Sequence, residues 1–560
     1  MPTLRIPTVA LSACALLCGP VFAQVGTVRA GVSPATVRLS SSWTRSLAAQ
    51  PSGALWCLVR ELDGSGTQAG TTLTLYISTD QGATWSPVAD TPTPGDGRGA
   101  VVADRSCDLL HVTWHATNGG SYSHLFYQAF DTSTLTWVGQ PDQLLTGTAS
   151  TNQFYPNDIS VTTGGTIGIT YNTNSTPTMS GLAPWSGGIM VKRRGDAAFQ
   201  GPYRCNTDTY GMLASAQAIG EVFHMSFRTN GGLYGIRYRA FDATTLQYVT
   251  ASDVPLYGTN QANMRSTNSS HIATDDAGNL YILYSVGSPN PAGGALEVAF
   301  ASPSNNYSTW TISLVESDPS LTAGNTTFQH YTLARAENGA VYAVFARASE
   351  NYQNLYARIL TPGPSGGAVV IPDPATTPGV PLLTSSEDDT FKQVDGLRAE
   401  AVHSGPMVVF SGTPTSRAAG YVDFMRLASA ARTVEWGLAC QGNLPQLPRL
   451  ASDTVPQTGT NFSFRITDAP TNTPGVVFAG FDCLVPPFDL GVLGMPDCAV
   501  FLTPLSSNLA VTDPSGNAAL QLAIPPGFGA FTLHFGALLL TPGANQGGAV
   551  ATNALAVNVN

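Results

Sequence analysis

A short apolar strand recurs seven times along this chain, and this repeat constrains the fold more than any other feature. The seven segments are Leu55–Val59, Leu110–Trp114, Ile167–Tyr171, Phe223–Phe227, Tyr281–Tyr284, Tyr342–Phe345 and Met407–Phe410. Their last residues are 55 to 65 positions apart, and six of the seven are aromatic. A recurring period of this length indicates a repeat architecture, in which each unit buries its apolar face against its neighbours.

Each repeat has room for four strands. A turn rich in Gly, Asp, Asn or Ser precedes most of the repeated segments, as Asp275–Asn279 does, and further strands lie on both sides, such as Ala100–Ala103 and Leu125–Phe130. Four-stranded units of this size are typical of β-propeller blades. The sequence therefore predicts an all-β fold with a seven-bladed propeller over residues 26–436, or a six-bladed one as the alternative. A piece around Val28–Leu39 is expected to complete the last blade.

The segment Ser78–Trp85 reads Ser-x-Asp-x-Gly-x-Thr-Trp and predicts a β-hairpin turn. The carboxylate of Asp80 can accept backbone N–H groups across the turn, and Gly82 can adopt a positive φ. The segment resembles the Asp box of sialidase-like and other BNR-repeat β-propellers, with the structural residues Ser78, Asp80, Gly82, Thr84 and Trp85. In those families the box lies on the outer part of a blade, so the resemblance implies a fold and hardly supports catalysis.

The first repeat also follows the order of a sialidase first blade. In that family an arginine before the first strand binds the substrate carboxylate, and an aspartate soon after the second strand is the general acid. Arg45 and Asp63 fill these two positions. The family's Phe/Tyr-Arg-Ile-Pro signature is reduced to Thr44–Leu47, and no Tyr–Glu nucleophile pair can be placed. The resemblance implies Arg228 and Arg347 as further arginines of a triad, and Tyr331 as the tyrosine.

Propellers bind ligands at a mouth of the central channel, where innermost strands begin and second strands end. The polar and aromatic residues at these positions are Arg45, Arg60, Arg98, His115, Tyr155, Asp158, Asn172, Tyr210, Arg228, His271, Ser285, His330, Tyr331, Arg347, Arg398 and Ser411. Arginine binds carboxylates through paired hydrogen bonds, and aromatic rings stack on sugar faces. The predicted ligand-binding residues are therefore Arg45, Arg60, Arg228, Arg347 and Tyr155.

Some polysaccharide lyases are seven-bladed propellers that use His, Tyr and Arg, and this analogy makes His271, His330 and His115 candidates for proton abstraction. The predicted catalytic residues are Asp63, Tyr331, His271 and His330.

No serine-nucleophile elbow, HExxH motif or EF-hand loop occurs, and the cysteine spacings match no zinc pattern, so neither a metal nor a cofactor is expected. Two hypotheses remain: a propeller that binds glycans or surface proteins, and a carbohydrate-active enzyme, either a sialidase-like glycoside hydrolase or a lyase.

The first residues predict export. Arg5 precedes the largely apolar run Ile6–Cys18, and Val21–Ala23 matches a signal-peptide cleavage site, so we expect residues 1–23 to be removed. No later stretch approaches the ~18 apolar residues of a membrane helix. The sequence therefore predicts a secreted or cell-surface protein without a transmembrane anchor. Its net charge of −11 argues against a nucleic-acid partner.

Export permits disulfides, and the expected pairs are Cys57–Cys107 and one pair among Cys440, Cys483 and Cys498.

After Trp436 the repeat ends, and residues 437–560 carry five β runs separated by turns rich in Pro and Gly. This pattern predicts a small β-sandwich. The segments Gly437–Gly442 and Gly494–Cys498 resemble a C-terminal module of exported planctomycete-type bacterial proteins, which implies surface attachment or sorting.

Overall fold

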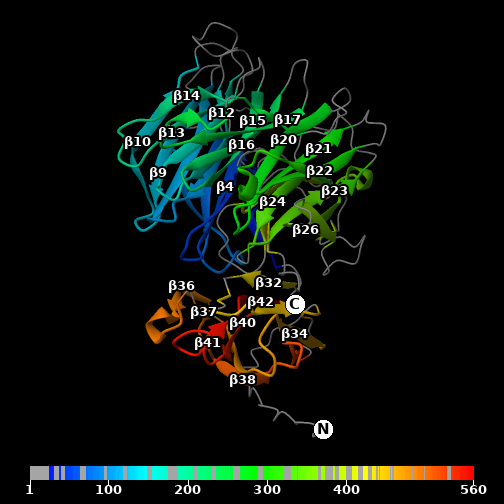
Figure 1. Ribbon diagram of the computed structural model, residues 1–560. Coiled ribbons are helices and arrows are strands. Elements are labelled where there is room, and N and C mark those ends of the chain that lie inside the picture. The colour runs from blue at the N-terminus through cyan, green and yellow to red at the C-terminus, as the bar shows by residue number, and fades with distance from the viewer. Residues whose placement is uncertain are drawn as a thin grey trace. The chain divides into compact units, whose positions relative to one another are not determined.

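The computed structural model divides the chain into two compact units, Ala23–Leu427 and a second that includes Ala428–Asn560 (Figure 1). It describes residues 24–559 apart from 31–36, 40–44, 63–70, 94–97, 118–122, 148–153, 174–186, 206–210, 230–234, 251, 257–264, 288–293, 319–329, 337–338, 363–367, 373–382, 385–389, 399–405, 414–420, 427–431, 437–438, 441, 455, 457–458, 482, 497 and 526–530. The expected signal peptide and the candidates Asp63 and Tyr210 lie outside the described residues. Within them, no helix is long and apolar enough to cross a membrane.

The described residues of the larger unit form seven antiparallel sheets, which we number as blades 1 to 7 in chain order. The innermost strands are β3 (Leu47–Ala49), β7 (Gly99–Ala103), β11 (Phe154–Val161), β15 (Gly211–Ile219), β20 (Arg265–Thr274), β24 (Tyr331–Arg335) and β29 (Thr390–Gly396). The second strands are β4 (Leu55–Leu62), β8 (Leu109–Thr117), β12 (Ile167–Thr173), β16 (Val222–Thr229), β21 (Leu280–Gly287), β25 (Val341–Ala346) and β30 (Met407–Thr413).

The third strands are β5 (Thr71–Ser78), β9 (Ser123–Asp131), β13 (Gly187–Lys192), β17 (Gly235–Asp242), β22 (Ala295–Ala301), β26 (Asn354–Pro362) and β31 (Tyr421–Arg426). The outer strands are β6 (Ser86–Asp90), β10 (Thr136–Leu145), β14 (Gln200–Arg204), β18 (Gln247–Tyr248) with β19 (Val254–Pro255), β23 (Thr311–Ser317), β27 (Ala368–Pro372) with β28 (Leu383–Thr384), and β1 (Gln24–Ala30). All seven repeated segments of the sequence lie in the second strands. A second strand has neighbours on both sides and is buried, which explains its nearly continuous apolar character.

The seven blades close into a ring. Each innermost strand contacts the innermost strand of the next blade, from β3 and β7 through to β24 and β29. The N-terminal strand β1 then pairs antiparallel with β31 of blade 7, from Gln24 opposite Arg426 to Ala30 opposite Tyr421. An apolar cluster joins Val59 of blade 1 to Val409 of blade 7. This arrangement is a β-propeller, as the sequence predicted.

Only the first part of the expected closing piece lies in blade 7. β1 completes that blade, whereas β2 (Val37–Leu39) pairs with β4 and so belongs to blade 1. An ion pair between Arg29 of β1 and Glu61 of β4 joins the two blades at 3.2 Å. The N-terminal segment therefore contributes to both sides of the closure.

The turn at Ser78–Trp85 has the geometry that its sequence predicts. The carboxylate of Asp80 accepts the backbone N–H of Thr84 at 2.8 Å, and Gly82 has a φ of +91°. The Trp85 ring lies 5.5 Å from the ring of Phe424 on β31, between their centroids. The best preserved hairpin of the chain thus packs against the closing blade.

The expected Cys57–Cys107 disulfide is wrong, because both thiols are free. Residues alternate between the two faces of β4, and Cys57 faces the apolar cluster shared with blade 7. Its neighbours Trp56 and Leu58 face blade 2, where Cys107 lies exposed in the turn between β7 and β8. The two sulfur atoms therefore belong to opposite sides of blade 1.

The second unit is a β-sandwich around one apolar core. Its larger sheet contains β32 (Arg432–Trp436), β42 (Ala554–Val559), β40 (Phe531–Leu540), β35 (Pro474–Gly480) and β38 (Ser506–Val511), with β41 (Ala549–Ala551) paired to β40. The other strands are β33 (Arg449–Ser452), β34 (Asn461–Thr467), β39 (Ala518–Ala523), β36 (Cys483–Asp489) and β37 (Ala499–Leu502). Facing rings of Phe464 and Phe535 lie 4.7 Å apart between centroids.

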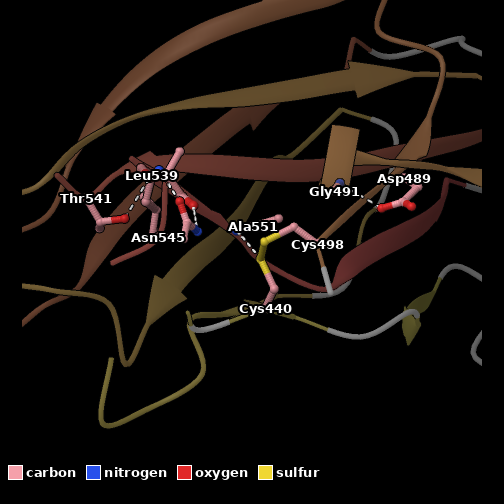
Figure 2. The surroundings of a disulfide bond; sticks show 9 residues. Cys440, Asp489, Gly491, Cys498, Leu539, Thr541, Asn545 and Ala551 are labelled. Atoms are coloured by element: carbon pink, nitrogen blue, oxygen red, sulfur yellow. Dashed lines mark hydrogen bonds between the residues drawn. A yellow bond between two sulfur atoms is a disulfide. The ribbon is translucent and has the colours of Figure 1, made fainter. Parts of the chain in front are cut away.

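Two features of this unit bear on the sequence analysis. Cys440 and Cys498 form a disulfide, which confirms the expected pair among the last cysteines (Figure 2). The strand β32 pairs with β42, so Arg432–Trp436 belongs to the sandwich rather than to the end of the propeller, where the sequence analysis placed it. The kinship of the sandwich to a known bacterial module stays a prediction.

We predict that Gly82→Ala destabilises the propeller more than Gly195→Ala. Both glycines have φ near +90°, so both substitutions carry the same backbone strain of about 1 kcal/mol. A Cβ at Gly82 would overlap the ring of Phe424, whereas nothing lies within 4 Å of a Cβ at Gly195. Overpacking adds roughly 1–3 kcal/mol at Gly82 alone. Denaturant unfolding of both variants measures the difference, and equal losses would contradict the packing.

Thiol alkylation of the native protein checks the cysteine assignment. We expect iodoacetamide to modify Cys107 in the folded protein and to modify Cys57 only after unfolding, because burial shields the second thiol. Peptide mapping by mass spectrometry identifies each modified residue. A peptide pair joined through Cys57 and Cys107 in the non-reduced protein would show that the assignment is incorrect.

Candidate functional site

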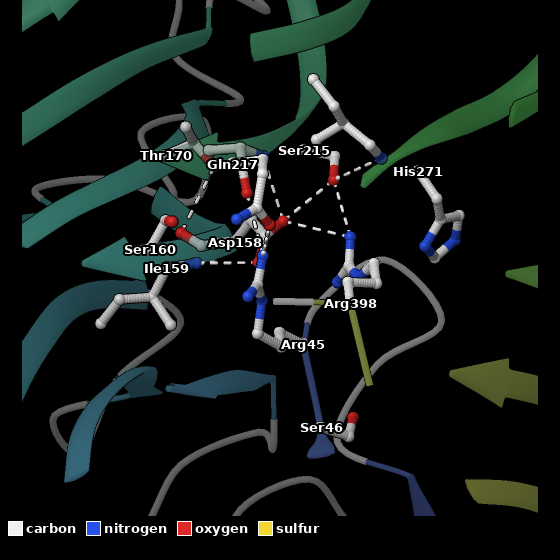
Figure 3. Close-up of polar contacts among 12 residues, drawn as sticks. Arg45, Ser46, Asp158, Ile159, Ser160, Thr170, Ser215, Gln217, His271 and Arg398 are labelled. Carbon is white, nitrogen blue, oxygen red and sulfur yellow. Dashed lines mark hydrogen bonds and ion pairs between the residues drawn. The ribbon is translucent and has the colours of Figure 1, made fainter. Parts of the chain in front are cut away.

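The side chain of Asp158 lies at the propeller axis and is completely buried. Asp158 belongs to blade 3, but it contacts Arg45 of blade 1 and Arg398 of blade 7 (Figure 3). Blade 3 is adjacent to neither of these blades, so the contacts must cross the axis. We call Arg45, Asp158, Ser215, Asp395 and Arg398 the axis network.

Both carboxylate oxygens of Asp158 are fully engaged. Oδ1 accepts from Arg45 Nε at 3.2 Å and from the Ile159 backbone N–H at 2.9 Å. Oδ2 accepts from Ser215 Oγ at 2.9 Å, from the Ala216 backbone N–H at 3.0 Å and from Arg398 Nη1 at 3.2 Å. Burial alone raises the pKa of Asp158, but the charges of Arg398 and Arg45 outweigh it and hold that pKa below its ordinary value.

A second carboxylate completes the network. Asp395 Oδ1 lies 3.7 Å from Arg398 Nη2, and Oδ2 accepts the backbone N–H of Ser46. Burial raises the pKa of Asp395 to about 6, against the lowering effect of the Arg398 charge. The network therefore holds two guanidinium groups and two carboxylates in a site without solvent access.

Four candidates gather at the end of the axis where the innermost strands begin, and we call them the mouth cluster: Arg60, Arg98, His115 and Tyr155. The Arg98 guanidinium lies 4.7 Å from the centroid of the Tyr155 ring, and the His115 ring lies 5.0 Å from that centroid, nearly perpendicular to it. The backbone N–H of His115 donates to the Arg98 carbonyl at 3.0 Å. The cluster thus combines residues of blades 1, 2 and 3.

The mouth cluster is positively charged and contains a neutral imidazole. Burial lowers the pKa of His115 well below its ordinary value, and the charges of Arg98 and Arg60 lower it further. His115 is completely buried, whereas Arg60, Arg98 and Tyr155 are partly exposed. The cluster therefore combines two partly exposed cations and a partly exposed aromatic ring with a buried imidazole.

Another group of candidates lies on blades 5 and 6. The ring of His271 is 5.9 Å from that of Tyr331, whose hydroxyl lies 3.3 Å from Ser285 Oγ. His330 stacks on Tyr352 at 3.5 Å between ring centroids. All three candidates of this group, His271, His330 and Tyr331, are buried. The structure therefore brings His271 and Tyr331 together and pairs His330 with a residue that the sequence did not indicate.

The two further arginines of the expected triad, Arg228 and Arg347, lie on blades 4 and 6. Arg347 binds Glu316 and Glu350, each at 3.0 Å, and its guanidinium covers the Tyr356 ring at 3.9 Å. Arg228 lies partly buried at the end of β16, opposite Met212 of β15. Arg45 is held by Asp158, and the sialidase-like arginine triad stays a prediction.

Tyrosine–glutamate contacts occur in the described residues, but away from the innermost strands. Tyr76 donates to Glu61 in blade 1, and Tyr356 donates to Glu350 at 2.7 Å in blade 6. In blade 5, Tyr284 and Glu297 are cross-strand partners, and burial raises the pKa of Glu297. None of these residues belongs to an innermost strand, and no local motif pairs them.

The sequence analysis missed Ser215 and Asp395. Asp395 lies three residues before Arg398, and this spacing was the only local signal for it. Ser215 has no local signal, because it is one small polar residue within β15. Thr332 was missed as well; its hydroxyl accepts the Gly396 N–H at 2.9 Å and so joins blade 6 to blade 7.

Comparisons with known proteins assign no family. No family model and no curated protein matches the chain. Solved structures that resemble it include an ulvan lyase (TM-score 0.43, 8% identity, covering 71% of this chain and 94% of that chain) and an α-L-arabinofuranosidase of Fusarium graminearum (0.39, 9%, 72% and 98%). Another is the Dos1 propeller (0.41, 11%, 72% and 96%). Likenesses with TM-scores this low carry no argument about this chain.

We predict that Asp395→Asn changes how stability depends on pH. The pKa of Asp395 rises from 3.8 to about 6 on folding, so the folded state holds this proton more tightly than the unfolded state. Stability should therefore fall as pH rises from about 4 to 6, by at most about 3 kcal/mol. The variant should lack this component of the decline, since it cannot titrate.

Melting temperatures between pH 4 and 7 measure the effect as the difference between wild type and variant. Exposed Asp108 provides the control, because Asp108→Asn removes a carboxylate from the solvent-exposed surface. A difference between wild type and Asp395→Asn that stays constant from pH 4 to 7 would show that Asp395 does not titrate in this range.

Proposed function

We propose that this protein is an exported propeller that binds acidic glycans at the mouth cluster. The observation that carries the proposal is the convergence of Arg60, Arg98 and Tyr155 around the neutral His115. Two guanidinium groups suit the carboxylate of a uronic or sialic acid, and an aromatic ring suits the face of a sugar. A surface protein with an exposed carboxylate is the other ligand that such a cluster fits.

Two features support binding ahead of turnover. The imidazole of His115 is completely buried, whereas Arg60, Arg98 and Tyr155 are partly exposed. A ligand from solvent would therefore contact these three side chains and not the imidazole. The carboxylates at the axis, Asp158 and Asp395, are themselves held by arginines and backbone N–H groups. A hydrolase of the retaining or inverting type needs two carboxyl groups that both reach the sugar.

A polysaccharide lyase is the second candidate, and the neutral His115 beside Tyr155 favours it. A lyase removes the proton next to the uronate carboxylate and breaks the bond to the sugar oxygen at the neighbouring carbon. The leaving oxygen takes up a proton from water or an acidic side chain, and a double bond remains between the two carbons. A neutral imidazole can accept that proton, although the lowered pKa of His115 makes it a weak base while it is buried, and an arginine can neutralise the carboxylate. This reaction requires His115 to become accessible when the substrate binds.

The sialidase-like alternative receives less support. Arg45, the arginine that the resemblance assigns to the substrate carboxylate, is bound to Asp158 and completely buried. Export is supported by the Cys440–Cys498 disulfide, because disulfides persist in oxidising compartments.

We predict that Arg60→Ala and Arg98→Ala each weaken binding to uronate-containing polysaccharides by roughly tenfold or more, since each removes a charged hydrogen-bond donor. A glycan array with acidic and neutral sugars identifies the ligand, and calorimetry measures its affinity. Arg105→Ala is the matched control, because Arg105 lies exposed just past the other end of β7 from Arg98.

Product analysis separates the two candidates. Binding without products, weakened in Arg98→Ala and unchanged in Arg105→Ala, supports the binding function. Unsaturated uronates, detected by their ultraviolet absorbance, would establish the lyase instead. If Arg60→Ala, Arg98→Ala and Arg105→Ala all bind every acidic glycan with equal affinity, the mouth cluster is not the binding site.

A further inference from the structure

The surroundings of Asp158 form a complete carboxylate-binding site. Five donors converge on its two oxygens: Arg45 Nε, Ile159 N, Ser215 Oγ, Ala216 N and Arg398 Nη1, at 2.9 to 3.2 Å. Two of them carry positive charge. Figure 3 shows Arg45, Ser215 and Arg398 around the carboxylate of Asp158, which belongs to β11. The ligand of this site is part of the protein itself.

The site joins segments that are distant in the sequence. Arg45 and Asp158 are 113 residues apart, and Asp158 and Arg398 are 240 residues apart. Arg45 Nη2 also donates to the Ala216 carbonyl at 3.0 Å, so blade 1 contacts blade 4 directly. One carboxylate therefore links blades 1, 3, 4 and 7 across the axis, in addition to the contacts that adjacent blades make.

The energetic balance depends on the carboxylate. Burying a charge is costly, and two arginines buried without Asp158 would leave positive charge poorly compensated. The second carboxylate, Asp395, lies 3.7 Å from Arg398, accepts the Ser46 N–H on its other oxygen and is also influenced by the charge of Arg45. Asp158 is the carboxylate that hydrogen-bonds to both guanidinium groups.

We propose that Asp158 acts as a built-in carboxylate ligand, which locks four blades together at the axis and occupies a site that accepts small free carboxylates once this side chain is removed. The consequence is that an acidic ligand cannot reach Arg45 or Arg398 while the lock is intact. This inference does not depend on the function proposed for the mouth cluster, since the two share no residue.

The test is chemical rescue of Asp158→Ala in the full chain. We expect its melting temperature to fall by roughly 5–10 °C, because one partner of a buried charge cluster is lost. Sodium formate should restore at least half of that loss and should saturate with concentration. Sodium chloride at equal ionic strength should not, because a spherical anion cannot use donors placed for two oxygens.

Two further variants act as controls. Asp158→Asn fills the same space without charge, so we expect a lower melting temperature that formate does not raise. Asp108→Ala removes an exposed carboxylate, and we expect neither a loss nor a response to formate. A melting temperature of Asp158→Ala equal to that of the wild type, or equal effects of formate and chloride on it, would overturn the proposal.

Asp158→Ala could also fail to fold. Refolding from denaturant then replaces melting: a higher yield of folded protein in formate than in chloride supports the lock, and equal measurable yields contradict it. If neither salt gives folded protein, Ser215→Ala decides the matter. It removes one donor to Asp158 and should lower the melting temperature by roughly 2–4 °C. An unchanged value would overturn the proposal.

Discussion

Closure of the ring is the constraint on which the rest of the propeller depends. Every blade buries apolar faces against two neighbours, so blade 1 is complete only when blade 7 lies beside it. The chain solves this by pairing β1, its N-terminal strand, with β31. The Arg29–Glu61 ion pair and the packing of Trp85 on Phe424 lie at the same junction. The hairpin with the most complete motif is therefore found where the ring must close.

Charge burial at the axis is the second constraint. A seven-sheet ring brings its innermost strands around a narrow core, and any ionisable residue there must find a partner inside the protein. Asp158 meets this requirement with two arginines and three uncharged donors, whereas Asp395 has Arg398 and one backbone N–H. The difference in partners explains why the pKa of Asp395 is raised by burial, whereas the pKa of Asp158 stays below its ordinary value.

The polar residues near the axis fall into two groups, the partly exposed mouth cluster and the buried axis network. Tyr155 and Asp158 lie on the same strand, three residues apart with a β-bulge between them, but only the first belongs to the partly exposed mouth cluster. The arginines follow the same division: Arg60 and Arg98 lie near solvent, and Arg45 and Arg398 are buried with carboxylates. Arginines with similar positions in the repeat thus have different environments.

The sequence by itself determined the local features of this protein. The repeated apolar segments specified seven buried second strands, because the strand pattern is a property of neighbouring residues. The turn at Asp80 followed from its own residues, as did the β runs of the C-terminal sandwich. The tertiary structure alone decided which side chains meet. Cys57 turned toward blade 7 instead of Cys107, and Arg45 turned to a carboxylate 113 residues away. A contact across the axis depends on how seven sheets close, and no local pattern carries that information.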